Sequence, residues 1–294
     1  MTSRIHPFGV ASMIAAACFG LAQAKVIREE SRVPVSIATE SSQYQRDVSL
    51  VTYVDDETAT PRPIAVVVHG RAGTAADRER TASSAIESQV RWLAKLGFLV
   101  AFPARIGYGS TGGEDFEESG PCSDKKYAPG FRAATQQIAQ VISHLRQGPD
   151  VMKDRVLLVG YSYGGAVALG TSALRDAGIA AVVAFAPGAG VNPMQPGVAC
   201  MAGRMEELFT EYGAAARSPV LWINAENDTF FGPAQSLSWY TAFTKNGAKA
   251  EQVVMPPQGE QGHYFFLRGQ ATWEPIVLRF LQQQKLAPMQ APPR

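Results

Sequence analysis

Short apolar runs alternate with segments of helical periodicity along most of the chain. Continuous or alternating apolar positions predict strands at residues 47–54, 64–68, 98–102, 155–159, 180–186, 220–224 and 251–255. Apolar positions spaced by three and four predict helices at residues 84–96, 131–146, 166–174, 233–246 and 272–284. Strands and helices in alternation are typical of a parallel sheet with helices on both faces. The pattern therefore predicts an α/β fold.

Three regions depart from this alternation. Residues 25–45 are polar and fit either an N-terminal extension or an edge strand. Residues 103–130 form a long loop in the pattern, and residues 187–217 are rich in glycine, proline and methionine, with one short helical piece at 204–209. We interpret the two longer regions as loop insertions near a functional site.

The first 24 residues have the three parts of a secretory signal peptide. Arg4 supplies a positive start, residues 8–21 are mostly apolar, and residues 22–24 form a small-residue cleavage site. The apolar run is shorter than a membrane span, which argues against the alternative of a permanent anchor. A second alternative is lipidation of Cys18, whose preceding residues match that signal poorly. We predict cleavage after Ala24 and export to the periplasm or the medium.

Composition and charge limit the partners of the mature chain. The sequence holds 27 basic and 26 acidic residues, and removal of the signal segment takes away Arg4 and no acid, which leaves 26 of each. A neutral chain without a basic run lacks the electrostatic footprint of a protein that binds nucleic acid or an anionic membrane. With 46% hydrophobic residues in the sequence, positions 25–286 predict a single domain, and the proline-rich residues 287–294 predict a disordered tail. The expected partner is a small molecule.

Two cysteines, Cys122 and Cys200, remain after removal of the signal segment. In an exported protein such a pair is expected to form a disulfide, because thiols oxidise outside the cytosol. The alternative is two buried free thiols. A role of Cys122 as a nucleophile is disfavoured, because no neighbouring residue in the sequence would activate its thiol.

The most informative motif is Gly160-Tyr161-Ser162-Tyr163-Gly164, which follows a predicted strand directly and precedes a helical pattern of small residues. This order is typical of a nucleophile elbow, a turn so sharp that the positions two before and two after the serine must lack a bulky side chain. Ser162 is the predicted nucleophile, and the backbone N–H of Tyr163 is a predicted oxyanion donor. The alternative is an ordinary glycine-rich turn in which the serine caps the helix.

A serine hydroxyl needs a base, and the base needs an orienting carboxylate. Of the three histidines after the signal segment, His144 is expected at a solvated helix surface and His69 in a structural hydrogen bond. This leaves His263, in a loop before the last helix, as the predicted base; the alternative is a loop histidine bound to backbone. Asp228, after the next-to-last strand, is the predicted orienting acid. Glu226 is its competitor, and a merely turn-capping aspartate is the alternative.

The order Ser162, Asp228, His263 with a Gly-x-Ser-x-Gly elbow resembles the α/β-hydrolase superfamily, in particular its dienelactone-hydrolase-like and prolyl-oligopeptidase-like branches. The similarity covers roughly residues 64–280 and includes a His-Gly loop after an early strand. It implies a doubly wound, mostly parallel sheet of about eight strands, acyl transfer to water, and no metal or organic cofactor. It also implies that the backbone N–H of Arg71 is the second oxyanion donor.

Aromatic residues near the predicted site by sequence adjacency suggest an apolar or aromatic acyl pocket, with core packing as the alternative. They are Tyr108, Tyr161, Phe230 and Phe231. The side chain of Arg71 is either solvated or meets an acidic group of the substrate.

Residues 107–112 match Gly-x-Gly-x-x-Gly after a strand, which is the pattern of a dinucleotide site. Residues 114–118 directly after it carry four carboxylates where a pyrophosphate would have to lie, and no helical pattern begins there. We therefore interpret the motif as a turn near the mouth of the site.

These residues predict an exported serine hydrolase, a carboxylesterase that acts on a small-molecule ester through an acyl-enzyme on Ser162. One alternative is a serine peptidase of the prolyl-oligopeptidase type, for whose large N-terminal domain the chain has no room. A second is a catalytically silent hydrolase fold used for binding, against which the presence of all three triad residue types argues. A dienelactone hydrolase in the strict sense is disfavoured, because that group resembles a cysteine-nucleophile enzyme and residue 162 is serine.

Overall fold

The computed structural model describes residues 25–39, 42–175 and 178–287. Eight strands form one sheet in the order β1-β2-β4-β3-β5-β6-β7-β8. β1 pairs antiparallel with β2, β2 pairs antiparallel with β4, and the remaining neighbours are parallel. The strands are β1 (Val26–Ala38), β2 (Gln43–Asp55), β3 (Arg62–Val68), β4 (Leu99–Ala104), β5 (Val151–Tyr161), β6 (Ile179–Phe185), β7 (Val220–Ala225) and β8 (Ala250–Met255). The sheet confirms the predicted doubly wound, mostly parallel architecture.

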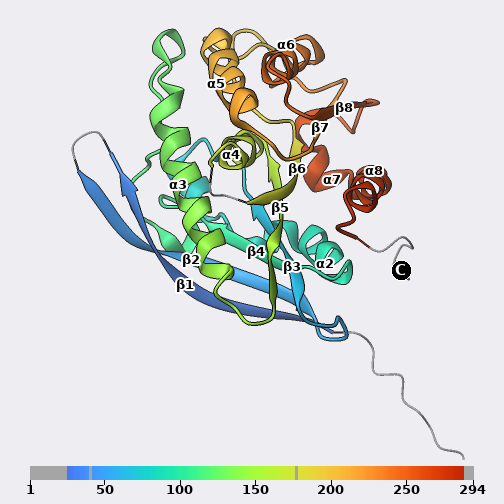
Figure 1. Ribbon diagram of the computed structural model, residues 1–294. Coiled ribbons are helices and arrows are strands. Elements are labelled where there is room, and N and C mark those ends of the chain that lie inside the picture. The colour runs from blue at the N-terminus through green and yellow to red at the C-terminus, as the bar shows by residue number, and fades with distance from the viewer. Residues whose placement is uncertain (1–24, 40–41, 176–177, 288–294) are drawn as a thin grey trace, which may run out of the picture.

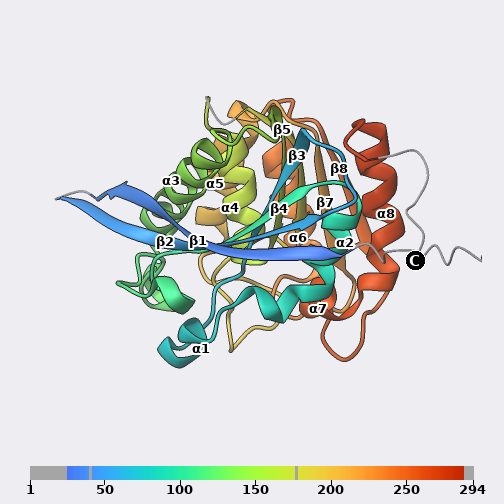
Figure 2. The ribbon, with the colours of Figure 1, turned by 90° about the horizontal axis from the view of Figure 1, so that it is seen from below.

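Helices cover both faces of this sheet (Figures 1 and 2). One face carries α3 (Tyr127–Leu145), α4 (Tyr163–Ser172), α5 (Ala202–Ala215) and α6 (Pro233–Thr244). The other face carries α2 (Glu87–Lys95), α7 (Phe265–Arg268) and α8 (Gln270–Gln283). A further short helix, α1 (Ala75–Glu79), buries none of its residues. The two helical layers enclose two separate apolar cores.

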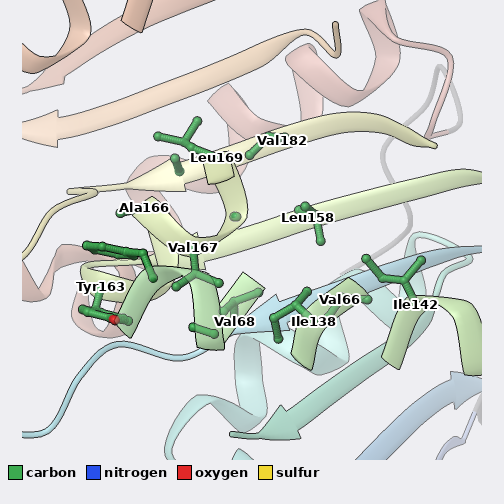
Figure 3. Packing of buried hydrophobic residues seen from close by; sticks show 14 of the residues in the cluster. Val66, Val68, Ile138, Ile142, Leu158, Tyr163, Ala166, Val167, Leu169 and Val182 are labelled. Atoms are coloured by element: carbon green, nitrogen blue, oxygen red, sulfur yellow. The ribbon is translucent and has the colours of Figure 1, made fainter. Parts of the chain in front are cut away.

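The central strands supply side chains to both cores, as their continuous apolar runs predict. Ile64, Val66 and Val68 of β3 face the α3 and α4 layer, whereas Ala65 and Val67 face the opposite layer. Figure 3 shows the first core, where side chains of α3 and α4 pack over β3, β5 and β6. Burying one such valine stabilises the fold by about 1.5–3 kcal/mol, so these strands hold the site rigidly.

The N-terminal segment is an edge strand, one of the two forms that the sequence left open. β1 pairs with β2 over its whole length. Gln140 of α3 also contacts β1: its side-chain amide accepts a hydrogen bond from the Ser36 N–H (3.0 Å) and donates to the Ser36 carbonyl (2.6 Å). Residues 28–32 are exposed, so this part of the strand is polar and lacks the apolar alternation that would predict a strand.

The region 187–217 differs from the prediction of a loop insertion with a short helical piece. Its second half forms the 14-residue helix α5, in which Met205 and Phe209 are completely buried. Gly203 and Gly213 lower the helix propensity of this segment, so packing rather than propensity determines the helix. The earlier loop also ends sooner than predicted, because α3 begins at Tyr127.

A disulfide joins Cys122 to Cys200, as predicted, with 5.0 Å between their Cα atoms. It links the segment before α3 to the segment just before α5. No helix in the described part of the chain is long and apolar enough to cross a bilayer. The predicted signal peptide and all but the first residue of the predicted tail lie outside the described residues, so these assignments stay predictions, as does the single domain over residues 25–286.

Candidate active site

The predicted site residues gather at the carboxyl end of the parallel strands. Ser162 follows β5, Asp228 follows β7 and His263 follows β8. β4 follows β3 in the chain and lies on one side of β3 within the sheet, whereas β5 lies on the other side of β3. The strand order therefore reverses at β3. Open α/β sheets bind ligands at such a reversal of strand order. The loop after β3, which contains residues 69–71, lies at the same point.

Ser162 occupies a strained turn between β5 and α4. Its φ angle is 56°, in the left-handed region that few residues other than glycine adopt. A Cβ atom on Gly160 would lie 2.2 Å from the Gly164 carbonyl oxygen, and one on Gly164 would lie 2.2 Å from the Val68 carbonyl oxygen. The serine hydroxyl makes no capping bond to α4. The turn therefore has the geometry of an elbow that presents the serine rather than of a serine cap.

His263 bridges Ser162 and Asp228. Its Nε2 lies 2.9 Å from the Ser162 hydroxyl, and its Nδ1 lies 2.9 Å from Asp228 Oδ2. A carboxylate accepts hydrogen bonds, so Nδ1 carries the proton and Nε2 is free to accept one from the serine. The other oxygen, Oδ1, accepts from the backbone N–H groups of Phe230 (2.7 Å) and Phe231 (2.9 Å). The structure thus brings the three predicted residues into one hydrogen-bonded chain.

The competing carboxylate, Glu226, is exposed, whereas the side chain of Asp228 is 0% exposed. Asp228 also caps the turn at residues 230–231, which was the alternative interpretation. The two sets of contacts use different oxygen atoms, so the same aspartate caps the turn and binds the imidazole.

The loop that carries His263 is tied to the loop after β7. The Gln261 side-chain oxygen accepts hydrogen bonds from the backbone N–H groups of His263 (3.1 Å) and Thr229 (3.0 Å). Gly262 packs so closely that a Cβ there would lie 2.4 Å from the Asn227 side-chain oxygen. These contacts hold the imidazole at a fixed distance from the aspartate.

The loop after β3 passes directly beside the nucleophile. A Cβ atom on Gly70 would lie 3.3 Å from the Ser162 Cβ and 3.1 Å from a ring carbon of Tyr161. On the other side of the serine, Tyr163 is the first residue of α4, so its N–H has no acceptor inside the helix. These positions are compatible with the predicted oxyanion donors, the N–H groups of Tyr163 and Arg71.

The side chain of Arg71 is 21% exposed and is held by carboxylates. Its guanidinium donates to both oxygens of Asp115 (2.7 and 2.9 Å) and to Glu118 (3.0 Å). Burial alone would lower the pKa of Arg71, but the bond to Asp115 and nearby negative groups raise it above its ordinary value. Asp115 also pairs with Arg78 at 3.1 Å. The side chain of Arg71 is thus partly exposed and is paired with carboxylates of this chain.

Tyr108 does not line an open pocket, contrary to expectation. Its side chain is 0% exposed, and its hydroxyl donates to Glu117 at 2.6 Å. Burial and the Glu117 charge raise the pKa of Tyr108 far above its ordinary value, so the phenol stays protonated. Glu117 in turn binds the fully buried Arg105. Sequence reasoning missed this pair, although an arginine directly after a buried strand and a run of carboxylates were both visible.

The other aromatic residues named above differ in their burial. Phe230 is half-buried, with its ring centroid 4.5 Å from that of His263. Tyr161 is half-buried and stacks on Phe266 at 4.9 Å. Phe231, 1% exposed, packs in the core against Trp239. Only Phe230 and Tyr161 remain as candidates to touch a substrate.

Residues 50–277 match the sequence profile of the Dienelactone hydrolase family. The chain belongs to this family. A curated relative, acyl-protein thioesterase 1 from Debaryomyces hansenii, is 27% identical over 117 residues, or 40% of this chain and 50% of the relative. The chain thus spans about half the length of that relative.

Two solved structures have a similar fold. One, assigned as a dienelactone hydrolase from Klebsiella pneumoniae, is 16% identical with a TM-score of 0.57, and the match covers 89% of this chain and 99% of that one. The other, the Pyrococcus horikoshii acylaminoacyl peptidase, is 15% identical with a TM-score of 0.59 and coverage of 91% and 43%. At these identities the likeness shows the fold.

Membership of the dienelactone hydrolase family supports a hydrolase of ester bonds. This member carries a serine, not a cysteine, at the elbow. Within the described residues, no cluster of three or more histidine, cysteine or acidic side chains could hold a metal ion.

Proposed function

We propose that this protein is an exported serine hydrolase that cleaves carboxylic esters through an acyl-enzyme on Ser162. The observation that carries the proposal is the pair of 2.9 Å contacts by which His263 joins Ser162 to Asp228. Nucleophile, base and orienting carboxylate in this order are the parts of a serine hydrolase triad.

In the first half-reaction, Ser162 Oγ attacks the ester carbonyl while His263 Nε2 takes its proton. The imidazolium that forms is stabilised by the Asp228 carboxylate, which stays ionised. The N–H groups of Tyr163 and Arg71 bind the negative oxygen of the tetrahedral intermediate. His263 then gives the proton to the departing alcohol, and an acyl-serine remains.

In the second half-reaction, His263 removes a proton from a water molecule that attacks the acyl carbonyl. The new tetrahedral intermediate uses the same two N–H donors, and its collapse returns the proton to Ser162 and releases the acid. Water and ester are consumed, alcohol and acid are formed, and no cofactor enters the reaction.

The proposed substrate is a small-molecule ester with an apolar or aromatic group. The half-buried ring of Phe230 beside the imidazole supports this choice. Export is supported by the Cys122–Cys200 disulfide, because such bonds persist in oxidising compartments. The mass of the secreted chain tests the export, since cleavage after Ala24 leaves Lys25 as the first residue.

A fluorophosphonate probe tests the mechanism. The wild-type protein should be labelled, Ser162→Ala should lose all labelling and ester hydrolysis, and Ser110→Ala, at an exposed serine, should behave as wild type. Paired p-nitrophenyl esters and p-nitroanilides on the same preparation separate esterase from peptidase. Faster cleavage of the anilide would favour a peptidase, and a folded wild-type protein that neither labels nor cleaves would favour a binding protein.

A further inference from the structure

His69 is held in one tautomer by two backbone groups. Its Nε2 lies 3.1 Å from the backbone nitrogen of Arg105, which can only donate, so Nε2 carries no proton. Its Nδ1 lies 2.7 Å from the Gly70 carbonyl oxygen, which can only accept, so Nδ1 carries the proton and donates it. Complete burial, with the Arg105 charge as a second cause, lowers the pKa of His69 well below its ordinary value of 6.5. The ring is therefore neutral.

The side chain of Arg105, which follows β4, binds the same loop. Its Nη1 donates to the His69 carbonyl at 2.7 Å, and Nη2 lies 3.4 Å from the Gly70 carbonyl. Glu117 fixes the guanidinium by accepting from Nε (2.5 Å) and Nη2 (3.1 Å). Two consecutive carbonyl groups of the loop thus point at donors that cannot rotate away.

This anchoring determines where the next N–H group points. The Gly70 carbonyl and the Arg71 N–H belong to one peptide unit, which is planar and trans, so the two bonds point in opposite directions. A carbonyl held toward His69 and Arg105 therefore turns the Arg71 N–H away from them. A Cβ atom on Gly70 would lie 3.3 Å from the Ser162 Cβ, so the peptide unit between Gly70 and Arg71 lies beside the nucleophile.

We propose that Arg105, His69 and Glu117 are positioning residues for the oxyanion hole, because they hold the Gly70–Arg71 peptide with its N–H toward the reacting carbonyl oxygen. The inference rests on the proposed function. Arg105 also contacts the residue of the other proposed donor, because its guanidinium lies 5.6 Å from the ring centroid of Tyr163. The buried guanidinium of Arg105 thus contacts the ring of Tyr163 and the loop that carries Arg71.

A purely structural role would be an inefficient use of this ion pair. Arg105 and Glu117 are 0% and 1% exposed, and a buried ion pair stabilises a fold no better than well-packed apolar side chains of similar volume. The directional bonds to two carbonyl groups are what apolar residues could not replace. The pair is therefore suited to orienting a backbone segment.

The test compares Arg105→Lys with Arg62→Lys. Lysine keeps the charge but loses the planar fork that reaches two carbonyls and a carboxylate. Arg62 is a half-buried arginine that donates to the Asp55 and Thr58 carbonyls at the opposite end of β3, which makes it a matched control. The quantities to compare are kcat and KM for p-nitrophenyl acetate, and inhibition by a boronic acid, whose tetrahedral adduct on Ser162 would place an oxygen in the oxyanion hole.

Arg105→Lys should lower kcat by about 10- to 100-fold, leave KM within about twofold, and weaken boronate inhibition by the same factor as kcat. A second pair of variants probes His69 without touching the ion pair. The amide of His69→Asn can place a donor where Nδ1 stood, whereas His69→Gln reaches only the Nε2 position. His69→Gln should therefore match Arg105→Lys, and His69→Asn should recover most of the loss. Arg62→Lys should match wild type.

Folded Arg105→Lys and His69→Gln proteins with wild-type kcat and boronate affinity would overturn the inference. So would losses of equal size in His69→Asn and His69→Gln, because a donor to the Gly70 carbonyl would then make no difference. If Arg105→Lys fails to fold, the two His69 variants decide. Absence of ester hydrolysis and of probe labelling in the wild-type protein would refute the proposed function itself, which is a separate outcome.

Discussion

The Nε2 atom of His263 lies 2.9 Å from the Ser162 hydroxyl, although 101 residues separate the two along the chain. The sheet produces this proximity, because β5 and β8 run parallel and end at the same edge. The acid comes from β7, which lies next to β8. The proposed chemistry therefore depends on strand order rather than on any local motif alone.

Asp228→Asn should lower kcat by about 10⁴-fold with a small change in KM. The amide cannot stabilise the imidazolium and favours the wrong imidazole tautomer, and this change costs a serine protease about that factor. Steady-state ester hydrolysis measures the effect. Glu226→Gln is the control, since Glu226 is exposed and should leave kcat unchanged. An Asp228→Asn protein with a tenth or more of wild-type kcat would remove Asp228 from the triad.

Gly70→Ala should reduce kcat by about tenfold or more while the protein stays folded. The new methyl group would lie 3.1 Å from Tyr161 and 3.3 Å from the Ser162 Cβ, so the loop or the serine must shift by a few tenths of an ångström. Small displacements of reacting groups are costly in rate. Gly73→Ala is the control, because a Cβ at Gly73 meets nothing within 4 Å. Equal kcat for the two variants would show that the loop tolerates displacement.

The three residues of the proposed triad could be predicted from the sequence because each of them follows a recognisable strand. The glycines around Ser162 mark the elbow, and the carboxyl ends of β7 and the loop after β8 supply the remaining side chains. The order of elements in the chain then limits the topology. Such features are local in sequence, even though the site is not.

The buried Arg105–Glu117 pair behind the loop after β3 could not be predicted in the same way. Arg105 and Glu117 lie in a glycine-rich loop without periodicity, and charged residues in such a loop are usually solvated. Only the fold reveals that they pair with each other at 0% and 1% exposure. The predicted pocket position of Tyr108 was wrong for a related reason. Adjacency in sequence to a site does not determine which way a ring points.

His69 should make the stability depend on pH below about 6.5. The folded state keeps His69 neutral, whereas the unfolded chain binds a proton below pH 6.5. The free energy of unfolding should therefore decrease as pH falls through this window, by up to about 1.4 kcal/mol per pH unit, and should show no such contribution above it. Urea unfolding at pH 7.0 and 5.5 measures the slope.

His69→Asn is the control for that slope. Asparagine does not titrate, so the stability of this variant should change less between the two pH values.

Asp115 contributes to stability in a different pH window. Burial opposes its ionisation, but hydrogen bonding to Arg71 lowers its pKa below the ordinary value of 3.8. Its stabilisation is present above about pH 4 and is lost only on further acidification. An identical pH dependence of stability in wild type and His69→Asn would contradict the assignment of the pH 7.0 to 5.5 change to His69.

Loss of the Cys122–Cys200 bond should destabilise the protein by about 2–4 kcal/mol. The bond connects positions 78 residues apart, and such a crosslink restricts the unfolded chain. The Cys122→Ser/Cys200→Ser double variant should unfold at lower urea than wild type. Reductant should shift the wild-type transition toward that of the variant and leave the variant unchanged. A wild-type transition that ignores reductant would contradict a stabilising bond.

Phe230→Ala should raise KM selectively for esters with large apolar groups. The ring lies 4.5 Å from the imidazole of His263, and the substitution keeps the backbone N–H that donates to Asp228. Burying an aromatic ring against a ligand stabilises by about 1.5–3 kcal/mol, which corresponds to roughly 10- to 100-fold in KM. Esters of graded acyl length should therefore diverge, with acetate nearly unaffected. Leu237→Ala, at a leucine 56% exposed on α6, should leave all KM values unchanged. Equal losses for every ester would mean that Phe230 supports the triad and does not contact the substrate.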